Sequence, residues 1–244
     1  MASGARLGYD TGMLAAVALA ALALPLAGKT VAVDPGHNGG NAAHSREIAR
    51  LVDAGTLRKA CDTVGASTND GYPEAAYTFD VSRRLARVLR ARGARVVLTR
   101  TSNAGWGPCI TRRAAIGNAV HADAAISVHA DGGPASGRGF HVIYPPSIRG
   151  LTDDISVASH RLALAVRGAF LRGTGEPYAD YTGRAALDVR SDLGGLNLSD
   201  VPKVFVETAN MRNAWDAARL RSAAYRQREA VALADGIEAY LRQS

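Results

Sequence analysis

The stretch Thr30-Val-Ala-Val-Asp-Pro-Gly-His37 is a short apolar run that ends abruptly in polar and turn-forming residues. Its first four residues have the β-branched composition of a buried strand, and the Asp-Pro-Gly sequence ends that strand. Two later stretches, 124–130 and 203–208, have the same form, with His129 and Glu207 directly after the apolar run. Three strands that each end in an imidazole or a carboxylate predict a functional site at one edge of a sheet.

Short apolar runs and amphipathic stretches alternate along the chain from Lys29 onward. Apolar residues at helical spacing predict the helices, and short runs bounded by Gly, Pro or polar residues predict the strands. The expected strands are 30–33, 95–98, 124–128, 139–144 and 203–206, and the expected helices are about 74–92, 110–120, 153–171 and 214–241. Residues 38–73 and 173–200 read as long polar loops, the second around one short strand. This order predicts an α/β fold, a single domain whose mainly parallel, twisted sheet is flanked by helices on both faces.

The composition of the 244-residue chain suits one globular domain, because 47% hydrophobic residues are enough for a full core. Disorder and coiled coil are disfavoured, since the chain is neither poor in apolar residues nor periodic over long stretches. An excess of 29 basic over 22 acidic residues gives a net charge of +7. The arginines are spread over helices such as 83–92 and 219–228 and form no basic tract with interleaved aromatics, so no nucleic-acid partner is expected.

Residues 13–27 form an uncharged apolar run near the amino terminus. The run is short for a membrane-spanning helix and has no polar face, which favours a secretory signal over a buried core helix. Asp10 and the weak cleavage sequence at 25–27 leave an uncleaved membrane anchor as the alternative. We therefore expect a secretory signal or anchor over 1–28, a mature domain over 29–244, and an exported protein of the periplasm, cell wall or extracellular space.

The two cysteines, Cys61 and Cys109, are too few for a disulfide-framework miniprotein or a four-cysteine zinc module. In an oxidising compartment they could form a disulfide that closes a loop of about 50 residues, which would stabilise the fold by roughly 4 kcal/mol. Two unpaired buried thiols are the alternative. We favour the disulfide, because both cysteines lie in polar connections where a cross-link helps most.

The carboxyl ends of parallel strands face one crevice, so His37, His129 and Glu207 are expected to converge there. Glu74 begins the predicted 74–92 helix directly after Gly-Tyr-Pro and adds a fourth polar group. Two imidazoles and one carboxylate, with a position left for water, form the arrangement of a hydrolytic zinc site. A second carboxylate would then move the proton of the attacking water. Spacing alone does not say which glutamate has which task, and any one of these residues alone is more often structural.

Several blocks of the sequence resemble, in order, the zinc-dependent N-acetylmuramoyl-L-alanine amidases, the amidase 3 family of peptidoglycan hydrolases. Residues 33–40 (VDPGHNGG) are similar to the opening motif of that family. The other similar blocks are Glu74 with GARVVLTR at 93–100, the helix at 113–118, the strand ISVHAD at 126–131, and VFVET at 204–208. Together they span about residues 30–241, nearly the whole mature chain.

The resemblance implies that 29–244 is a zinc amidase catalytic domain. It implies a Zn²⁺ ion held by His37, Glu74 and His129, with Glu207 as the catalytic carboxylate. The implied reaction is hydrolysis of the amide between N-acetylmuramic acid and L-alanine, in peptidoglycan or in muropeptides. We expect a monomer that needs no obligate protein partner.

Two further residues have open roles. Asp34 either orients a ligand imidazole from behind or forms the Asp-Pro-Gly turn through its own side chain. His141 stands where the family often has Glu, and substrate contact or ordinary sheet packing is expected of it. Asn38, Ala209 and Met211 also depart from the family pattern without removing a ligand.

Pro145 to Asp154 is too short to hold the inhibitory helix that plugs some relatives, so we expect an open site. The other histidines, His44, His121 and His160, are expected to lie away from the metal. Two other functions stay open from the sequence: a zinc peptidase that cuts within the stem peptide, and a non-catalytic cell-wall-binding regulator.

Overall fold

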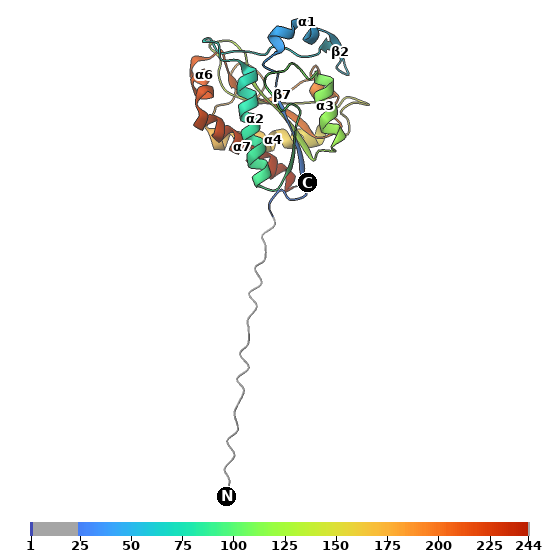
Figure 1. Cartoon of the computed structure of the whole chain (residues 1–244), viewed down its shortest axis with the longest axis vertical. Coiled ribbons are helices and arrows are strands. Elements are labelled where there is room, and N and C mark those ends of the chain that lie inside the picture. The colour runs from blue at the N-terminus through green and yellow to red at the C-terminus, as the bar shows by residue number, and fades with distance from the viewer. Residues whose placement is uncertain (2–23, 244) are drawn as a thin grey trace.

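The structure, a computed structural model, describes Met1 and residues 24–243 (Figure 1). Its strands are β1 (Thr30–Pro35), β2 (Leu51–Asp53), β3 (Arg58–Ala60), β4 (Arg95–Leu98), β5 (Ala124–Asp131), β6 (His141–Tyr144), β7 (Leu187–Val189) and β8 (Lys203–Asn210). Its helices are the 3-10 helix η1 (Asn41–His44), α1 (Ser45–Ile48), α2 (Glu74–Ala91), α3 (Ile110–Ala119), α4 (Ser156–Thr174), α5 (Gly194–Asn197), α6 (Ala214–Arg221) and α7 (Ala223–Leu241).

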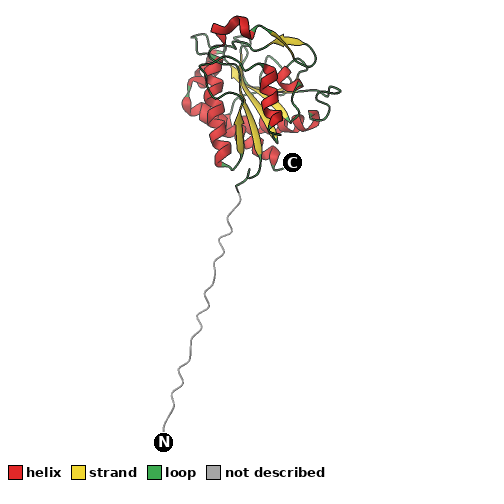
Figure 2. Ribbon diagram, turned by 45° about the vertical axis from the view of Figure 1, so that its right-hand side comes forward, coloured by secondary structure: helices red, strands yellow, loops and turns green. Residues whose placement is uncertain are grey.

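The main sheet has six strands in the order β4-β1-β5-β8-β6-β7. The first four strands run parallel to one another, whereas β6 pairs antiparallel with β8, and β7 is parallel to β6. Helices lie on both faces of the sheet (Figure 2), with α2, α4 and α7 on one face and α3 and α5 on the other. The predicted α/β domain with a mainly parallel sheet and helices on both faces is confirmed.

The central strands divide their side chains between two unequal layers, because successive residues of a strand point to opposite faces. Val31 and Val33 point into the main core, which the sheet shares with α2, α4 and α7. Ala32 points to the other face, where α3 packs closely on the strand. A Cβ added at Gly117 of α3 would lie only 3.5 Å from the Cβ of Ala32. The same alternation places Asp34 on this second face, beyond the small residues. The second face therefore carries polar groups at the carboxyl ends of the strands.

The predicted helix over 214–241 is in fact two helices, α6 and α7, which meet at Ser222. Ser222 is extended (φ −73°, ψ 118°), and its Oγ accepts a hydrogen bond from the backbone N–H of Tyr225 at 3.3 Å. This side chain caps α7 and separates it from α6. Val231 of α7 is 36% exposed, so the apolar residues of this stretch do not all face the core. The apolar periodicity continues across the break, so periodicity alone predicted one helix.

Residues 38–73, expected to form a loop, contain η1, α1 and the antiparallel pair β2–β3. Helices of four residues and strands of three are too short to leave a periodic signal in the sequence. The expected loop over 173–200 contains the predicted short strand, β7, and also α5. No helix interrupts the connection between β6 and α4 among the described residues, in keeping with the expected open site.

Leu26 is part of the buried core, although it falls within the predicted leader over 1–28. Its backbone N–H donates a hydrogen bond to the carbonyl of Arg92 at 2.9 Å. Residues 2–23 lie outside the described residues, so the secretory signal or anchor stays a prediction. Within the described part of the chain, no helix combines the length and the apolar character needed to cross a bilayer.

A disulfide joins Cys61, at the end of the β2–β3 pair, to Cys109, which precedes α3. The double variant Cys61→Ser/Cys109→Ser is expected to lose about 4 kcal/mol of unfolding free energy, because the cross-link restricts the unfolded chain. Urea unfolding of both proteins without reductant measures the difference. Wild type unfolded in the presence of reductant serves as the control and should approach the variant. Coinciding midpoints for wild type and variant would contradict the prediction.

Candidate metal centre

The register of the central strands brings polar side chains together on the second face of the sheet. Asp34 of β1 pairs with Ser127 of β5, and His129 of β5 pairs with Glu207 of β8. Residues 127 and 129 of one strand share a face, and directly paired residues of neighbouring strands do so as well. The alternation of each strand thus carries Asp34, Ser127, His129 and Glu207 to one side.

Three side chains from distant parts of the chain meet at this edge of the sheet. His37 follows β1, Glu74 is the first residue of α2, and His129 lies in β5. One candidate ligand atom from each residue lies within 4.8 Å of the other two, so the group could hold a metal ion. Glu74 Oε2 is 3.2 Å from Nε2 of His37, and Glu74 Oε1 is 3.0 Å from Nδ1 of His129.

Two glycines make room for this convergence. A Cβ at Gly36 would lie 2.3 Å from Cε1 of His129, and a Cβ at Gly65 would lie 2.7 Å from Cδ2 of His37. Gly65 also has a φ of +85°, a conformation that side chains other than glycine rarely adopt. Both positions therefore need glycine if the imidazoles are to reach Glu74.

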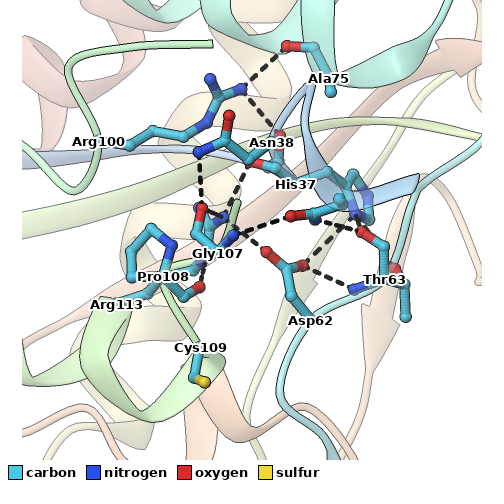
Figure 3. A network of polar contacts seen from close by, with 12 residues as sticks. His37, Asn38, Asp62, Thr63, Ala75, Arg100, Gly107, Pro108, Cys109 and Arg113 are labelled. Atoms are coloured by element: carbon cyan, nitrogen blue, oxygen red, sulfur yellow. Dashed lines mark hydrogen bonds and ion pairs between the residues drawn. The ribbon is translucent and has the colours of Figure 1, made fainter. Parts of the chain in front are cut away.

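Hydrogen bonds fix which nitrogen of His37 carries a proton. Nδ1 of His37 is 3.0 Å from the carbonyl oxygen of Thr63, which can only accept, so Nδ1 must donate (Figure 3). Nε2 is then the nitrogen that faces Glu74. Asp62 lies 3.7 Å behind the same Nδ1. Burial alone would lower the pKa of His37, but Glu74 and Asp62 raise this pKa to about 10.

The second imidazole is fixed in a similar way. Nε2 of His129 is 3.1 Å from the hydroxyl of Ser127, and that hydroxyl donates to Oδ2 of Asp34 at 2.8 Å. The Ser127 oxygen therefore accepts from Nε2, which leaves the lone pair of Nδ1 facing Glu74. The ring of His129 also stacks on Phe205, with centroids 5.1 Å apart and planes at 5°.

Glu74 is held in place by the backbone as well as by the imidazoles. Its Oε2 accepts from the N–H of Ala66 at 2.7 Å, and its Oε1 accepts from the N–H of Ala130 at 3.2 Å. Burial by itself would raise the pKa of the Glu74 carboxyl, but His37 and His129 hold this pKa well below its usual range. The carboxylate is thus ionised and aimed between the two rings.

The donor set of the site fits a divalent cation. Two imidazole nitrogens face one ionised carboxylate at hydrogen-bond distance, an arrangement that needs either protons or a cation between these atoms. Two neutral imidazoles and one carboxylate are also a common ligand set of hydrolytic zinc sites, where a fourth position stays open. The residues that the sequence predicted as metal ligands are therefore placed where they could act as such.

Glu207 stands beside this group with one carboxylate oxygen that no described residue engages. Its Oε2 is buried and makes no hydrogen bond within the described residues. Burial, together with the charges of Glu74 and Asp131, raises the pKa of Glu207 well above its ordinary value. A buried carboxylate oxygen without a hydrogen bond is costly for folding alone, which points to a functional reason for its presence.

A groove runs past the group on both sides. The two hollows that form it share His37, His129, Leu193 and Phe205 as common walls. One hollow continues toward Lys59, Ile110 and Gly194, and the other continues toward Glu74, Arg190 and Glu207. A substrate lying along the groove would thus cross the candidate metal centre with Glu207 on one side.

The remaining predicted residues lie as follows. Asp34 is buried and accepts hydrogen bonds from Arg113, Thr99 and Ser127, so it reaches His129 only through Ser127. His141 of β6 pairs with Glu207 in register and is 2% exposed, and its ring contacts Tyr181 edge-on. A substrate contact by His141 stays a prediction.

The three other histidines lie outside the group of metal-ligand type. His44 stacks on Trp106, His160 stacks on Tyr144, and His121 follows the end of α3. Sequence reasoning did not single out Asp62, Thr63 or Ser127. The only local signal for Asp62 is its place next to Cys61, a residue that the disulfide was expected to fix.

An α/β domain that gathers two imidazoles and a carboxylate at the ends of parallel strands, with a second carboxylate beside them, has the architecture of a metal-dependent hydrolase. The sequence matches the Amidase_3 family model, described as N-acetylmuramoyl-L-alanine amidase, over residues 31–239. The chain therefore belongs to the Amidase_3 family of N-acetylmuramoyl-L-alanine amidases, and it is an enzyme of that class.

Individual relatives agree with this assignment. The chain is 44% identical over 218 residues to the N-acetylmuramoyl-L-alanine amidase Rv3717 of Mycobacterium tuberculosis, with 88% of each chain covered. The fold matches the crystal structure of the amidase Ami1 from Mycobacterium smegmatis with a TM-score of 0.84 and 40% identity, over 90% of this chain and 99% of that chain. Apo Ami1 from Mycobacterium abscessus matches with a TM-score of 0.82 and 41% identity, over 88% of this chain and 99% of that chain.

Proposed function

We propose that this chain is a zinc-dependent amidase that hydrolyses the bond between N-acetylmuramic acid and L-alanine, in peptidoglycan or in muropeptides. Membership of the Amidase_3 family supports the reaction. The observation that carries the zinc dependence is the convergence of His37, Glu74 and His129, whose ligand atoms lie within 4.8 Å of one another.

In this proposal Nε2 of His37, the Glu74 carboxylate and Nδ1 of His129 hold the ion. These ligand atoms already lie close together, and Thr63 and Ser127 engage the opposite ring nitrogens. When bound, zinc supplies Lewis acidity, which polarises a carbonyl group and makes hydroxide available near neutral pH. The protein supplies the fixed geometry and the walls of the groove.

Glu207 is the proposed general base and acid. It takes a proton from the attacking water and delivers it to the departing nitrogen of L-alanine. One C–O bond forms, the amide C–N bond breaks, and the products are a lactyl carboxylic acid and a free amine. The unpartnered Oε2 of Glu207 on the wall of the groove supports this role, since no other described residue engages it.

All four groups of the proposed site come from one chain, which supports a monomer without an obligate protein partner. We also propose that the protein is exported to the periplasm, cell wall or extracellular space, where peptidoglycan lies. Because Leu26 is buried in the core, the leader or anchor would have to end before that residue. The positive net charge would favour attraction to anionic wall polymers, an effect that salt weakens.

The bond that is cut decides between an amidase and a stem-peptide peptidase. Purified protein is incubated with peptidoglycan and with a muramyl peptide, with and without a chelator, and the products are analysed by mass spectrometry. We expect peptides with a new free L-alanine amine together with unsubstituted sugars, and no products after chelation until Zn²⁺ is added back.

Other products would overturn the proposal. Fragments cut within the stem peptide would identify a peptidase instead. Intact substrate together with no bound zinc at native purity would favour a non-catalytic wall-binding protein.

A further inference from the structure

We propose that Arg113 is a positioning residue of the metal centre. Its buried guanidinium holds Asp34 and Asp62, the carboxylates on the far side of the two imidazoles from Glu74. The inference rests on the proposed metal site. It concerns why His37 and His129 present the correct ring nitrogens, which neither imidazole can ensure by itself.

Arg113 lies on α3 with its side chain 5% exposed and uses every N–H of its guanidinium (Figure 3). Nη1 donates to Oδ1 of Asp34 at 2.8 Å, and Nη2 donates to Oδ2 of Asp62 at 2.9 Å. Its other bonds go to the carbonyl oxygens of Pro35, His37, Gly107 and Pro108. The Arg113 guanidinium therefore connects two buried carboxylates with the main chain at His37 and at Pro35.

The route to His37 passes through Asp62. Oδ1 of Asp62 accepts from the backbone N–H of Thr63 at 2.8 Å, and the Thr63 carbonyl receives Nδ1–H of His37. Arg113 also donates to the carbonyl oxygen of His37 itself at 2.9 Å. The main chain of His37 is thus held by Arg113 and its ring by Thr63, so that Nε2 is directed at Glu74.

The route to His129 passes through Asp34 and Ser127. The Ser127 hydroxyl has a single proton, and an ionised Asp34 takes it, so the hydroxyl oxygen can only accept from Nε2 of the imidazole. Despite burial, Arg113 and Lys203 hold the pKa of Asp34 well below its usual range. Without that charge the hydroxyl could turn and donate to Nε2, and the imidazole proton would then occupy Nδ1, the nitrogen that faces Glu74.

A second buried arginine shows what is particular to Arg113. Arg100 is equally buried, but its hydrogen bonds go only to neutral oxygens, among them the carbonyls of Pro35, Gly36 and Ala75. Arg113 alone of the two binds carboxylates that stand behind the imidazoles. Outer partners of this kind orient ligand rings and fix their tautomers.

The test is the affinity of the metal-free protein for Zn²⁺, measured by competition with a chelator of known affinity. The variants are Arg113→Lys, which keeps the charge but cannot reach both carboxylates, and Ser127→Ala, which breaks only the route to His129. Loss of such outer partners lowers metal affinity by roughly 10–100-fold, and we expect this loss in each variant. Ser82→Ala removes a buried hydroxyl that makes no hydrogen bond within the described part of the chain. It is the matched control and should bind Zn²⁺ as wild type does.

The thermal midpoint of each metal-free protein separates positioning from folding. Ser127→Ala is expected to keep a midpoint close to that of wild type while its zinc affinity falls, a combination that a purely structural role would not produce. If Ser127→Ala binds Zn²⁺ as tightly as wild type, the proposal is overturned, even where Arg113→Lys unfolds. A wild-type protein that does not bind Zn²⁺ would overturn the metal site itself, and this inference with it.

Discussion

Replacement of Glu207 by glutamine is expected to lower kcat for amide hydrolysis by roughly 10²–10⁴-fold, the usual contribution of a general acid–base group. Glutamine keeps the size of the side chain but cannot take a proton from water or return it to the leaving amine. The affinity for Zn²⁺ should change little, because Glu207 lies outside the group of three candidate ligands. Initial rates on a muramyl peptide, with the zinc content of each protein determined, measure the effect.

Glu176→Gln provides a matched control for this variant. Glu176 is a buried glutamate with one oxygen that makes no hydrogen bond within the described residues, and burial raises its pKa to about 7. It differs from Glu207 because it pairs with Tyr225 and with arginines away from the groove. This variant should retain the wild-type kcat. An undiminished rate in the Glu207→Gln protein would refute the assignment of Glu207, and an equal loss in both variants would point to a general effect on folding.

The sequence could predict that two imidazoles and a carboxylate lie near one edge of the sheet, because their positions follow from local rules. Apolar runs that end in His37, His129 and Glu207 specify strands, and the carboxyl ends of parallel strands meet at one edge of a sheet. The side-chain period of two then brings His129 and Glu207 to the same face, as their register confirms. These predictions need only the period of a strand and the direction of its neighbours.

The groups behind the ligands could not be predicted in this way. Asp62 and Thr63 belong to a stretch that reads as loop, and their place beside His37 depends on how the whole region folds back over the strand ends. Ser127 sits within an apolar run, where a small hydroxyl looks like an ordinary strand residue. The antiparallel pairing of β6 with β8 likewise has no signal in the local sequence, because strand direction is set by the connections between strands.

Glu74→Ala is expected to weaken Zn²⁺ binding by more than the roughly 10–100-fold that loss of an outer partner costs, and to abolish hydrolysis at ordinary zinc concentrations. The variant removes the one anionic member of the ligand group and leaves only the imidazoles of His37 and His129. Loss of the carboxylate also frees the N–H groups of Ala66 and Ala130, so the start of α2 is less firmly joined to β5. Zinc affinity and residual rate, each followed as a function of added Zn²⁺, measure the outcome.

Thermal unfolding gives a reading of the same variant that does not depend on activity. A ligand that binds only the folded state stabilises it by about 2.7 kcal/mol at a free concentration of 100 times Kd, so Zn²⁺ should raise the midpoint of the wild-type protein. The midpoint of Glu74→Ala should not respond to the same concentrations, whereas Glu47→Gln, which changes an exposed glutamate on α1, should respond as wild type does. A Glu74→Ala protein that zinc stabilises as strongly as wild type would remove Glu74 from the ligand set. The two imidazoles would then have to bind the ion with another carboxylate, and Glu207, which pairs with His129 in register and lines the same hollow, is one candidate.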